Sequence, residues 1–205
     1  MKAVELPLPG EGRALDIGTG TGDLAKMLAG KTAEVVGLDA SRVMLDLAMR
    51  KASASGLEQR VCFTQGDAVS LPFSDDAFEC VATAFTARNV GDLPRLFSEM
   101  HRVAKPHHPV VCLEFTYPSS RWVRFFYYPY LRYVLPLLGI LAGGDRAALR
   151  YLSDSIRAFP GVHEVKTTME AAGLDRVTIR LLNLGPVSIH VGWKDKFKTL
   201  EIVGG

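Results

Sequence analysis

The first half of the chain alternates between short apolar runs of strand character and segments whose apolar residues recur at helical spacing. Strands that alternate with helices in this way are typical of βαβ units and a parallel sheet. The pattern predicts seven strands, at residues 14–17, 34–38, 61–63, 78–85, 110–115, 177–182 and 187–191. It predicts helices at 24–29, 41–56 and 92–103, aromatic helical sequence to about 141, and two further helical stretches at 149–159 and 165–172.

The run from Phe78 to Phe85 is almost wholly apolar, as expected for a central strand that is covered on both faces. The sequence therefore predicts an α/β fold with a doubly wound, mostly parallel seven-stranded sheet and helices on both faces. It contains no internal repeat and no linker rich in Ser, Gly or Pro. We expect a single domain over residues 1–205, with a helical insertion at about 119–160.

Composition removes several function classes. The 205 residues include 24 basic and 22 acidic side chains, and this net charge of +2 gives no electrostatic reason to expect a nucleic-acid partner. Hydrophobic residues make up 48% of the chain, which is ordinary for a globular protein and argues against disorder.

Targeting and redox features point to the cytoplasm. Residues 1–12 lack the apolar core of a signal peptide, and the most apolar later stretch, 121–144, is interrupted by arginines and prolines. The three cysteines, Cys62, Cys80 and Cys112, lie in apolar strand-like runs, so we expect buried, reduced thiols. The sequence leaves open whether the protein is fully soluble or is attached peripherally to a membrane.

A glycine-rich loop, Gly-Thr-Gly-Thr-Gly at 18–22, follows the first strand and precedes the first helix, where an open α/β sheet binds its ligand. A dinucleotide fingerprint would need glycine at position 23, which is Asp23, and a P-loop lysine is also missing. The loop therefore favours an unphosphorylated nucleoside. The nearby Asp16 carboxylate suits a cation, and Asp39, at the end of the second strand, suits ribose hydroxyls.

S-adenosylmethionine meets these requirements, because its amino group and sulfonium are positive and its ribose carries two hydroxyls. The alternative for Asp39 is that it only caps the helix that begins near Ser41. At the end of the third strand, Asp67 and the Ala68 backbone are placed to contact an adenine.

Several separated segments resemble class I methyltransferases, and more closely the family that methylates demethylmenaquinol and ubiquinol precursors. They are LDIGTGTGDLA at 15–25, VVGLDASRVML at 35–45, GDAVSLPFSDDAFE at 66–79, RNV at 88–90, EMHRVAKP at 99–106, LEFTYP at 113–118, YLSDSIRAFPG at 151–161 and SIHVGWK at 188–194. The resemblance covers nearly the whole chain. It implies a Rossmann-like class I methyltransferase fold and S-adenosylmethionine as cofactor.

Carried over position by position, the resemblance implies cofactor contacts along the strand ends. Ala84 stands where many relatives carry serine, so one hydrogen bond is expected to be lost there. We also expect Asp16, Gly22 and Met44 to line the cofactor site. The contacts implied directly are at Gly18, Thr21, Asp39, Asp67 and Ala68.

The chain departs from the family pattern at two places. Only about a dozen residues precede the first strand, where relatives carry a helical segment that covers the cofactor, so the chain is either a short variant or incomplete. After Lys105-Pro106, relatives have glycines, whereas this chain has His107-His108. We interpret the two histidines as an exposed turn and predict no metal site.

Methylation of a hydroquinone ring carbon needs electron density on that carbon, which ionisation of the neighbouring hydroxyl supplies. Arg88 is the candidate to hold the phenolate, directly or through a water molecule, and Asn89 is the candidate to orient the same group. The alternative is that Arg88 pairs with a surface carboxylate and organises its loop. His190, in the last strand, is either a further polar contact or a structural histidine.

The sequence predicts a lipophilic quinol as the acceptor and leaves three other functions open. The aromatic residues and arginines of 121–133 suit either a pocket wall at a membrane surface or ordinary packing. The acceptor could instead be another lipophilic molecule or a phospholipid amine, or the chain could be a silent cofactor-binding subunit. A nicotinamide-linked oxidoreductase is disfavoured by the missing glycine, and a homodimer is left open.

Overall fold

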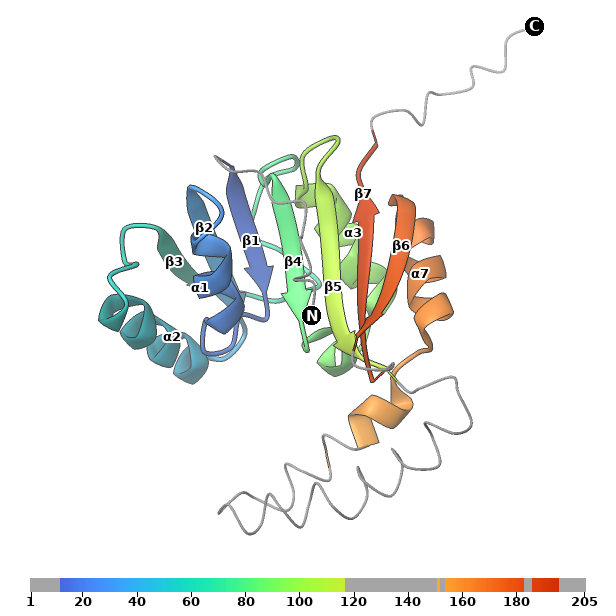
Figure 1. Cartoon of the computed structure of the whole chain (residues 1–205), viewed down its shortest axis with the longest axis horizontal. Coiled ribbons are helices and arrows are strands. Elements are labelled where there is room, and N and C mark those ends of the chain that lie inside the picture. Colours follow the sequence, from blue (N-terminus) through green and yellow to red (C-terminus); the bar gives the residue numbers. More distant parts are fainter. Residues whose placement is uncertain (1–11, 117–150, 152–153, 183–185, 196–205) are drawn as a thin grey trace, which may run out of the picture.

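A computed structural model describes residues 12–116, 151, 154–182 and 186–195 of the chain (Figure 1). The strands are β1 (Arg13–Ile17), β2 (Glu34–Asp39), β3 (Val61–Gln65), β4 (Cys80–Ala84), β5 (Pro109–Phe115), β6 (Asp175–Leu182) and β7 (Val187–Trp193). The helices are α1 (Asp23–Ala29), α2 (Arg42–Ala54), α3 (Leu93–Val103), α7 (Val162–Ala171) and the short 3-10 helix η1 (Ala87–Asn89).

The strands form one sheet in the order β3-β2-β1-β4-β5-β7-β6. Neighbours from β3 to β5 are parallel, and β7 is antiparallel to both β5 and β6. Strand order reverses between β1 and β4, and ligands of open α/β sheets bind outside the carboxyl ends of the strands at such a point. The predicted doubly wound, mostly parallel sheet is confirmed.

Helices cover both faces of the sheet, as predicted. Side chains alternate along a strand, so Ala14 and Leu15 of β1 face opposite layers. Leu15 belongs to a core with Phe97 of α3 and Met169 of α7, whereas Ala14 packs in a second core with Leu28 of α1. Figure 1 shows α1 and α3 on opposite sides of the sheet. The fold thereby holds the carboxyl ends of β1 and β4 between two buried layers.

Two details of the sequence prediction are wrong. Strand β4 begins at Cys80 rather than Phe78, because the Phe78 amide donates to the carbonyl of Val103, and the Lys105 amide donates to the carbonyl of Phe78. Phe78 therefore pairs with the end of α3 instead of β1. Cys62 is exposed, not buried, because β3 is an edge strand of the sheet.

The predicted boundaries elsewhere differ by a few residues. Ser41 and Asp92 cap α2 and α3 as expected, through bonds from the Met44 and Arg95 amides. Helix α7 begins earlier than predicted, at Val162.

Most of the predicted insertion at 119–160, with its aromatic residues, lies outside the described residues. Within the described part of the chain, no helix has the length and apolar content needed to span a bilayer.

Candidate functional site

A cleft of about 800 Å³ lies at the carboxyl ends of β1 to β4. We call it the strand-end cleft. Its walls come from the glycine loop after β1, the turn into α2, the 66–69 turn after β3 and the segment from β4 to Asp92. It brings together most of the predicted site residues: Gly18, Thr21, Asp39, Met44, Asp67, Ala68, Ala84 and Asn89.

The glycine loop is held tightly against two neighbouring strands. The amides of Gly18 and Thr19 both donate to the carbonyl of Leu38, at 2.7 and 2.9 Å. The hydroxyl of Thr86 donates to the Gly18 carbonyl at 3.1 Å and contacts the Ala84 carbonyl at 3.2 Å. Gly18 has a φ of +67°, a conformation that glycine adopts without strain. The loop is therefore fixed before any ligand arrives.

Asp39 joins the glycine loop to the start of α2. One carboxylate oxygen accepts the Gly20 amide at 2.8 Å, and the other accepts the Ser41 amide at 2.8 Å. The helix-capping side chain is Ser41, so Asp39 is not merely the cap of α2. Each carboxylate oxygen can accept a further hydrogen bond. Asp39 can therefore bind a ligand hydroxyl while it holds the loop.

Asp67 and Ala84 mark the two remaining strand ends of the cleft. The Asp67 carboxylate accepts the Val69 amide at 3.0 Å, which shapes the turn after β3, and its side chain is exposed. Ala84 ends β4 and is half-buried, with a methyl group in place of any polar contact. The cleft thus offers acidic and backbone groups after β2 and β3, and apolar surface at β4.

Asp16 and Gly22 do not line the cleft. Asp16 is 1% exposed, and its carboxylate accepts the Thr19 hydroxyl at 2.7 Å, beneath the loop. Burial raises the pKa of Asp16 from 3.8 to about 7, although the Thr19 hydrogen bond works in the opposite direction. Gly22 is buried at the start of α1. Both residues shape the loop from behind in this geometry, in place of the direct contacts expected for them.

The raised pKa of Asp16 gives a pH-dependence prediction. The folded state keeps this proton up to about pH 7, whereas the unfolded chain releases it near pH 3.8. The contribution of protonated Asp16 to the free energy of unfolding is therefore complete below pH 3.8 and is lost as the pH rises to about 7. When the pH is raised from 5 to 8, the stability of Asp16→Asn relative to wild type should therefore increase by on the order of 2 kcal/mol, because only wild type loses this contribution. Urea unfolding at both pH values measures this difference, and a difference that does not change with pH would contradict it.

Arg88 lies in a buried ion pair rather than in the strand-end cleft. Its Nη1 donates to Oε1 of Glu114 at 2.6 Å and to the carbonyl of Phe85 at 2.6 Å, and its own backbone amide donates to Oε2 of Glu114 at 3.1 Å. The two side chains are 11% and 0% exposed. The guanidinium also lies over the Phe115 ring, 5.4 Å from its centre. These contacts tie η1 to β5.

The geometry favours one of the two roles considered for Arg88. Its charge is compensated by Glu114, so a role in organising the loop fits these contacts better than direct contact with a phenolate, and the partner is a buried carboxylate rather than a surface one. Glu114 was not predicted as a functional residue. A signal was present, because it is the one charged residue in an otherwise apolar strand, Pro109–Phe115.

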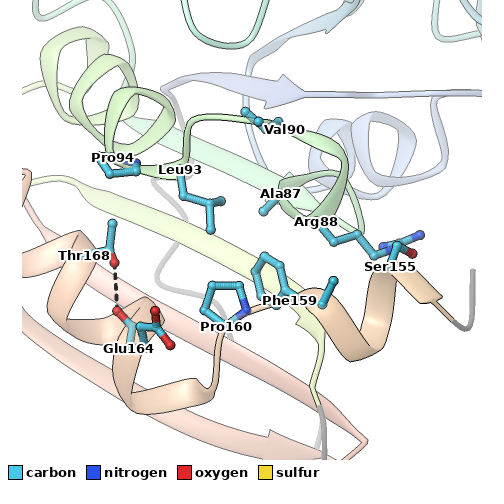
Figure 2. Close-up of a pocket in the computed structure, with 12 residues that line it drawn as sticks. Ala87, Arg88, Val90, Leu93, Pro94, Ser155, Phe159, Pro160, Glu164 and Thr168 are labelled. Atoms are coloured by element: carbon cyan, nitrogen blue, oxygen red, sulfur yellow. Dashed lines mark hydrogen bonds between the residues drawn. The ribbon is translucent and has the colours of Figure 1, made fainter.

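A second pocket of about 380 Å³ separates η1 and α3 from α7, and we call it the η1–α7 pocket. It shares Val90 and Gly91 with the strand-end cleft. Figure 2 shows Leu93 facing Phe159 across this pocket, which Arg88 and Ser155 also line. The two cavities therefore meet at the segment that follows η1.

Asn89 is the one residue of η1 that lines the strand-end cleft. It is exposed, and its amide oxygen accepts the hydroxyl of Tyr151 at 3.0 Å. This contact joins the cleft to a segment 62 residues later in the chain. Asn89 was predicted as a catalytic residue and lies at the cleft, whereas no role was predicted for Tyr151.

The histidines have structural surroundings. His190 is fully buried, and its Nε2 lies 2.9 Å from the carbonyl of Val162. Burial lowers the pKa of His190, so the ring favours its neutral form. His107 is exposed in a turn with a φ of +64°, as predicted. No group of three or more His, Cys, Asp or Glu side chains suited to a metal ion occurs among the described residues.

Comparisons with known proteins identify the relatives of this chain. Residues 2–194 match the model of the ubiE/COQ5 methyltransferase family. The chain is 45% identical to a demethylmenaquinone methyltransferase of Thermus thermophilus, over 93% of this chain and 87% of that protein. It is 41% identical to the ubiquinone/menaquinone biosynthesis C-methyltransferase UbiE of Pseudomonas aeruginosa, over 89% of this chain and 72% of that protein.

Solved structures show the same fold. A SAM-dependent methyltransferase from Aquifex aeolicus superposes with a TM-score of 0.65 at 20% identity, covering 91% of this chain and 84% of that one. At this identity the likeness establishes the architecture alone. It is that of a Rossmann-like class I methyltransferase.

Proposed function

The chain belongs to the ubiE/COQ5 methyltransferase family, and we propose that it transfers a methyl group from S-adenosylmethionine to a ring carbon of a prenylated quinol in quinone biosynthesis. One observation carries the proposal: residues from four strand ends, chosen from the sequence as cofactor contacts, line a single cleft at the reversal of strand order. The acceptor class comes from the names of the relatives, which refer to demethylmenaquinone and to ubiquinone/menaquinone biosynthesis.

The strand-end cleft fits S-adenosylmethionine in its donor and acceptor groups. Asp39 would hold the ribose hydroxyls, and Asp67 with the Ala68 backbone would contact the adenine. A Cβ atom built on Gly20 would lie more than 4 Å from any atom it could meet, so this part of the loop faces open space that a ligand can fill. When bound, the cofactor supplies an electrophilic methyl group on a positively charged sulfur.

Loss of Asp39 should weaken cofactor binding. A charge-assisted hydrogen bond contributes about 1.5–3 kcal/mol, so Asp39→Ala should raise the dissociation constant about ten- to a hundredfold. Calorimetric titration with S-adenosylmethionine measures it. Asp46→Ala is the matched control, because Asp46 is on α2 and, among the described residues, pairs only with Arg42 at the surface. Equal affinities of wild type and Asp39→Ala would argue that Asp39 only shapes the loop.

The chain's own part in catalysis is to bind, align and stabilise an anion. The acceptor ring carbon would form a bond to the methyl group while the methyl–sulfur bond breaks, with a neutral thioether as the leaving group. The ring carbon then loses its proton, so one proton is released for each methyl transferred. Electron density on that carbon comes from ionisation of the neighbouring hydroxyl. Asn89, at the cleft, would donate a hydrogen bond to the phenolate, and Arg88 would act one step away by fixing η1 to Glu114.

Acceptor profiling tests the proposed substrate class. The purified chain is incubated with methyl-labelled S-adenosylmethionine and either a short-tailed demethylmenaquinol or phosphatidylethanolamine, under anaerobic reducing conditions. Label in the quinol alone is the expected result. Label in the phospholipid amine would replace the proposed acceptor, and cofactor binding without product from either acceptor would point to another lipophilic acceptor or to a silent subunit.

A further inference from the structure

Asn89 is held at the cleft by a hydroxyl from outside the sheet. The phenol oxygen of Tyr151 donates to the amide oxygen of Asn89 at 3.0 Å. Tyr151 is 59% exposed, so it contributes little to the hydrophobic core. The hydrogen bond is therefore not a by-product of core packing.

The backbone of Asn89 is already fixed from two sides. Its amide donates to the carbonyl of Thr86 at 2.8 Å, and the Thr86 hydroxyl in turn donates to the Gly18 carbonyl. On the other side, Arg88 ties η1 to Glu114. The freedom that remains at Asn89 is rotation of its side chain, and Tyr151 acts on that rotation.

The two ends of an asparagine amide do opposite chemistry, because the oxygen accepts hydrogen bonds and the NH2 group donates them. An anionic acceptor oxygen needs the NH2 end. Tyr151 engages the oxygen end, and the NH2 group has no hydrogen bond to any described residue. A phenol hydroxyl can donate or accept, so Tyr151 anchors the end of the side chain, and the orientation with the NH2 group outward is the favourable one beside an anion. Without the hydroxyl, the side chain could rotate away from the phenolate or present its oxygen, which would repel it.

We propose that Tyr151 is a positioning residue for the methyl transfer: its hydroxyl holds the Asn89 oxygen so that the Asn89 NH2 group faces the phenolate oxygen of the acceptor. This role rests on the proposed function. It also narrows the acceptor class to molecules with an ionisable hydroxyl next to the methylated carbon, since a neutral amine would gain nothing from a fixed NH2 donor.

Tyr151→Phe tests the role because it removes only the hydroxyl. We expect kcat near neutral pH to fall about tenfold, the loss expected for one hydrogen bond to an anion, with the KM for S-adenosylmethionine unchanged. The midpoint of the rise of kcat with pH should move up by about one pH unit. A tenfold loss of phenolate stabilisation raises the pKa of the bound acceptor's hydroxyl by about one. At higher pH the two enzymes should converge.

A double-mutant cycle separates positioning from general damage. In the Asn89→Ala background, Tyr151→Phe should have no further effect on kcat. The control is Thr167→Val, which should match wild type. It removes an exposed α7 hydroxyl that, within the described part of the chain, bonds only to the His163 carbonyl of the same helix.

Three results would overturn the role. The first is a pH profile of kcat in Tyr151→Phe that is the same as in wild type. The second is an equal loss of kcat from Tyr151→Phe in the wild-type and Asn89→Ala backgrounds. The third is a wild-type kcat in Tyr151→Phe. Each of these leaves the methyltransferase assignment intact. A wild-type enzyme that methylates no quinol at all would instead contradict the proposed function, and the role of Tyr151 with it.

Discussion

Replacing Gly18 with alanine is expected to cost about 2–5 kcal/mol of stability and to weaken cofactor binding at least about a hundredfold. A Cβ at Gly18 would lie 2.2 Å from both Cγ2 and Oγ1 of Thr86. Thr86 cannot move away freely, because its hydroxyl bonds to the Gly18 and Ala84 carbonyls. The positive φ of Gly18 adds strain for any residue with a Cβ.

Gly20→Ala provides the matched stability control for Gly18→Ala. Gly20 also has a positive φ, +55°, but a Cβ there would meet no atom within 4 Å. Its loss of stability should be limited to backbone strain, about 1–2 kcal/mol. Urea unfolding of the two variants measures the difference. Equal stabilities would mean that the contact with Thr86 does not constrain the loop.

Removing Glu114 is expected to destabilise the fold by about 3–5 kcal/mol, because it leaves the Arg88 guanidinium largely buried without its partner. The Arg88 backbone amide also loses its acceptor. Glu114→Ala should therefore unfold at clearly lower urea concentration than wild type. The control is Glu34→Ala, which breaks a half-exposed pair with Arg13 and should change stability by at most about 1 kcal/mol.

The double variant Arg88→Met, Glu114→Leu separates charge from shape. Apolar replacement of both partners of a buried pair is often close to neutral, so this variant should recover most of the stability lost in Glu114→Ala. It should remain poorly active, because η1 would lose the contact that fixes it to β5. Full activity in the double variant would show that the ion pair serves folding alone.

The sheet and most of the cleft could be predicted because they depend on local signals. Asp39 is the last residue of β2 and Asp67 lies two residues after β3, and parallel strands bring their carboxyl ends to one edge. Asp16 carries the same kind of signal, but it lies inside β1, before the strand ends, and the hydroxyl of Thr19 in the glycine loop covers its carboxylate.

Contacts that depend on three-dimensional pairing could not be predicted. Arg88 meets Glu114 because β4 and β5 are neighbours in a particular register, and nothing near Arg88 in the sequence shows this. The Tyr151–Asn89 bond depends in the same way on distant segments. Cys62 was misplaced because the apolar run 61–63 does not reveal that its strand lies at the edge.

The most direct test of the proposed activity is the position of the transferred methyl group. Wild-type protein is incubated with methyl-labelled S-adenosylmethionine and demethylmenaquinol in its reduced form, and the product is analysed by NMR spectroscopy and mass spectrometry. The account predicts label on the ring carbon with both hydroxyls unmodified, and no product from the oxidised quinone. Label on an oxygen atom, or no product from protein that binds the cofactor, would contradict it.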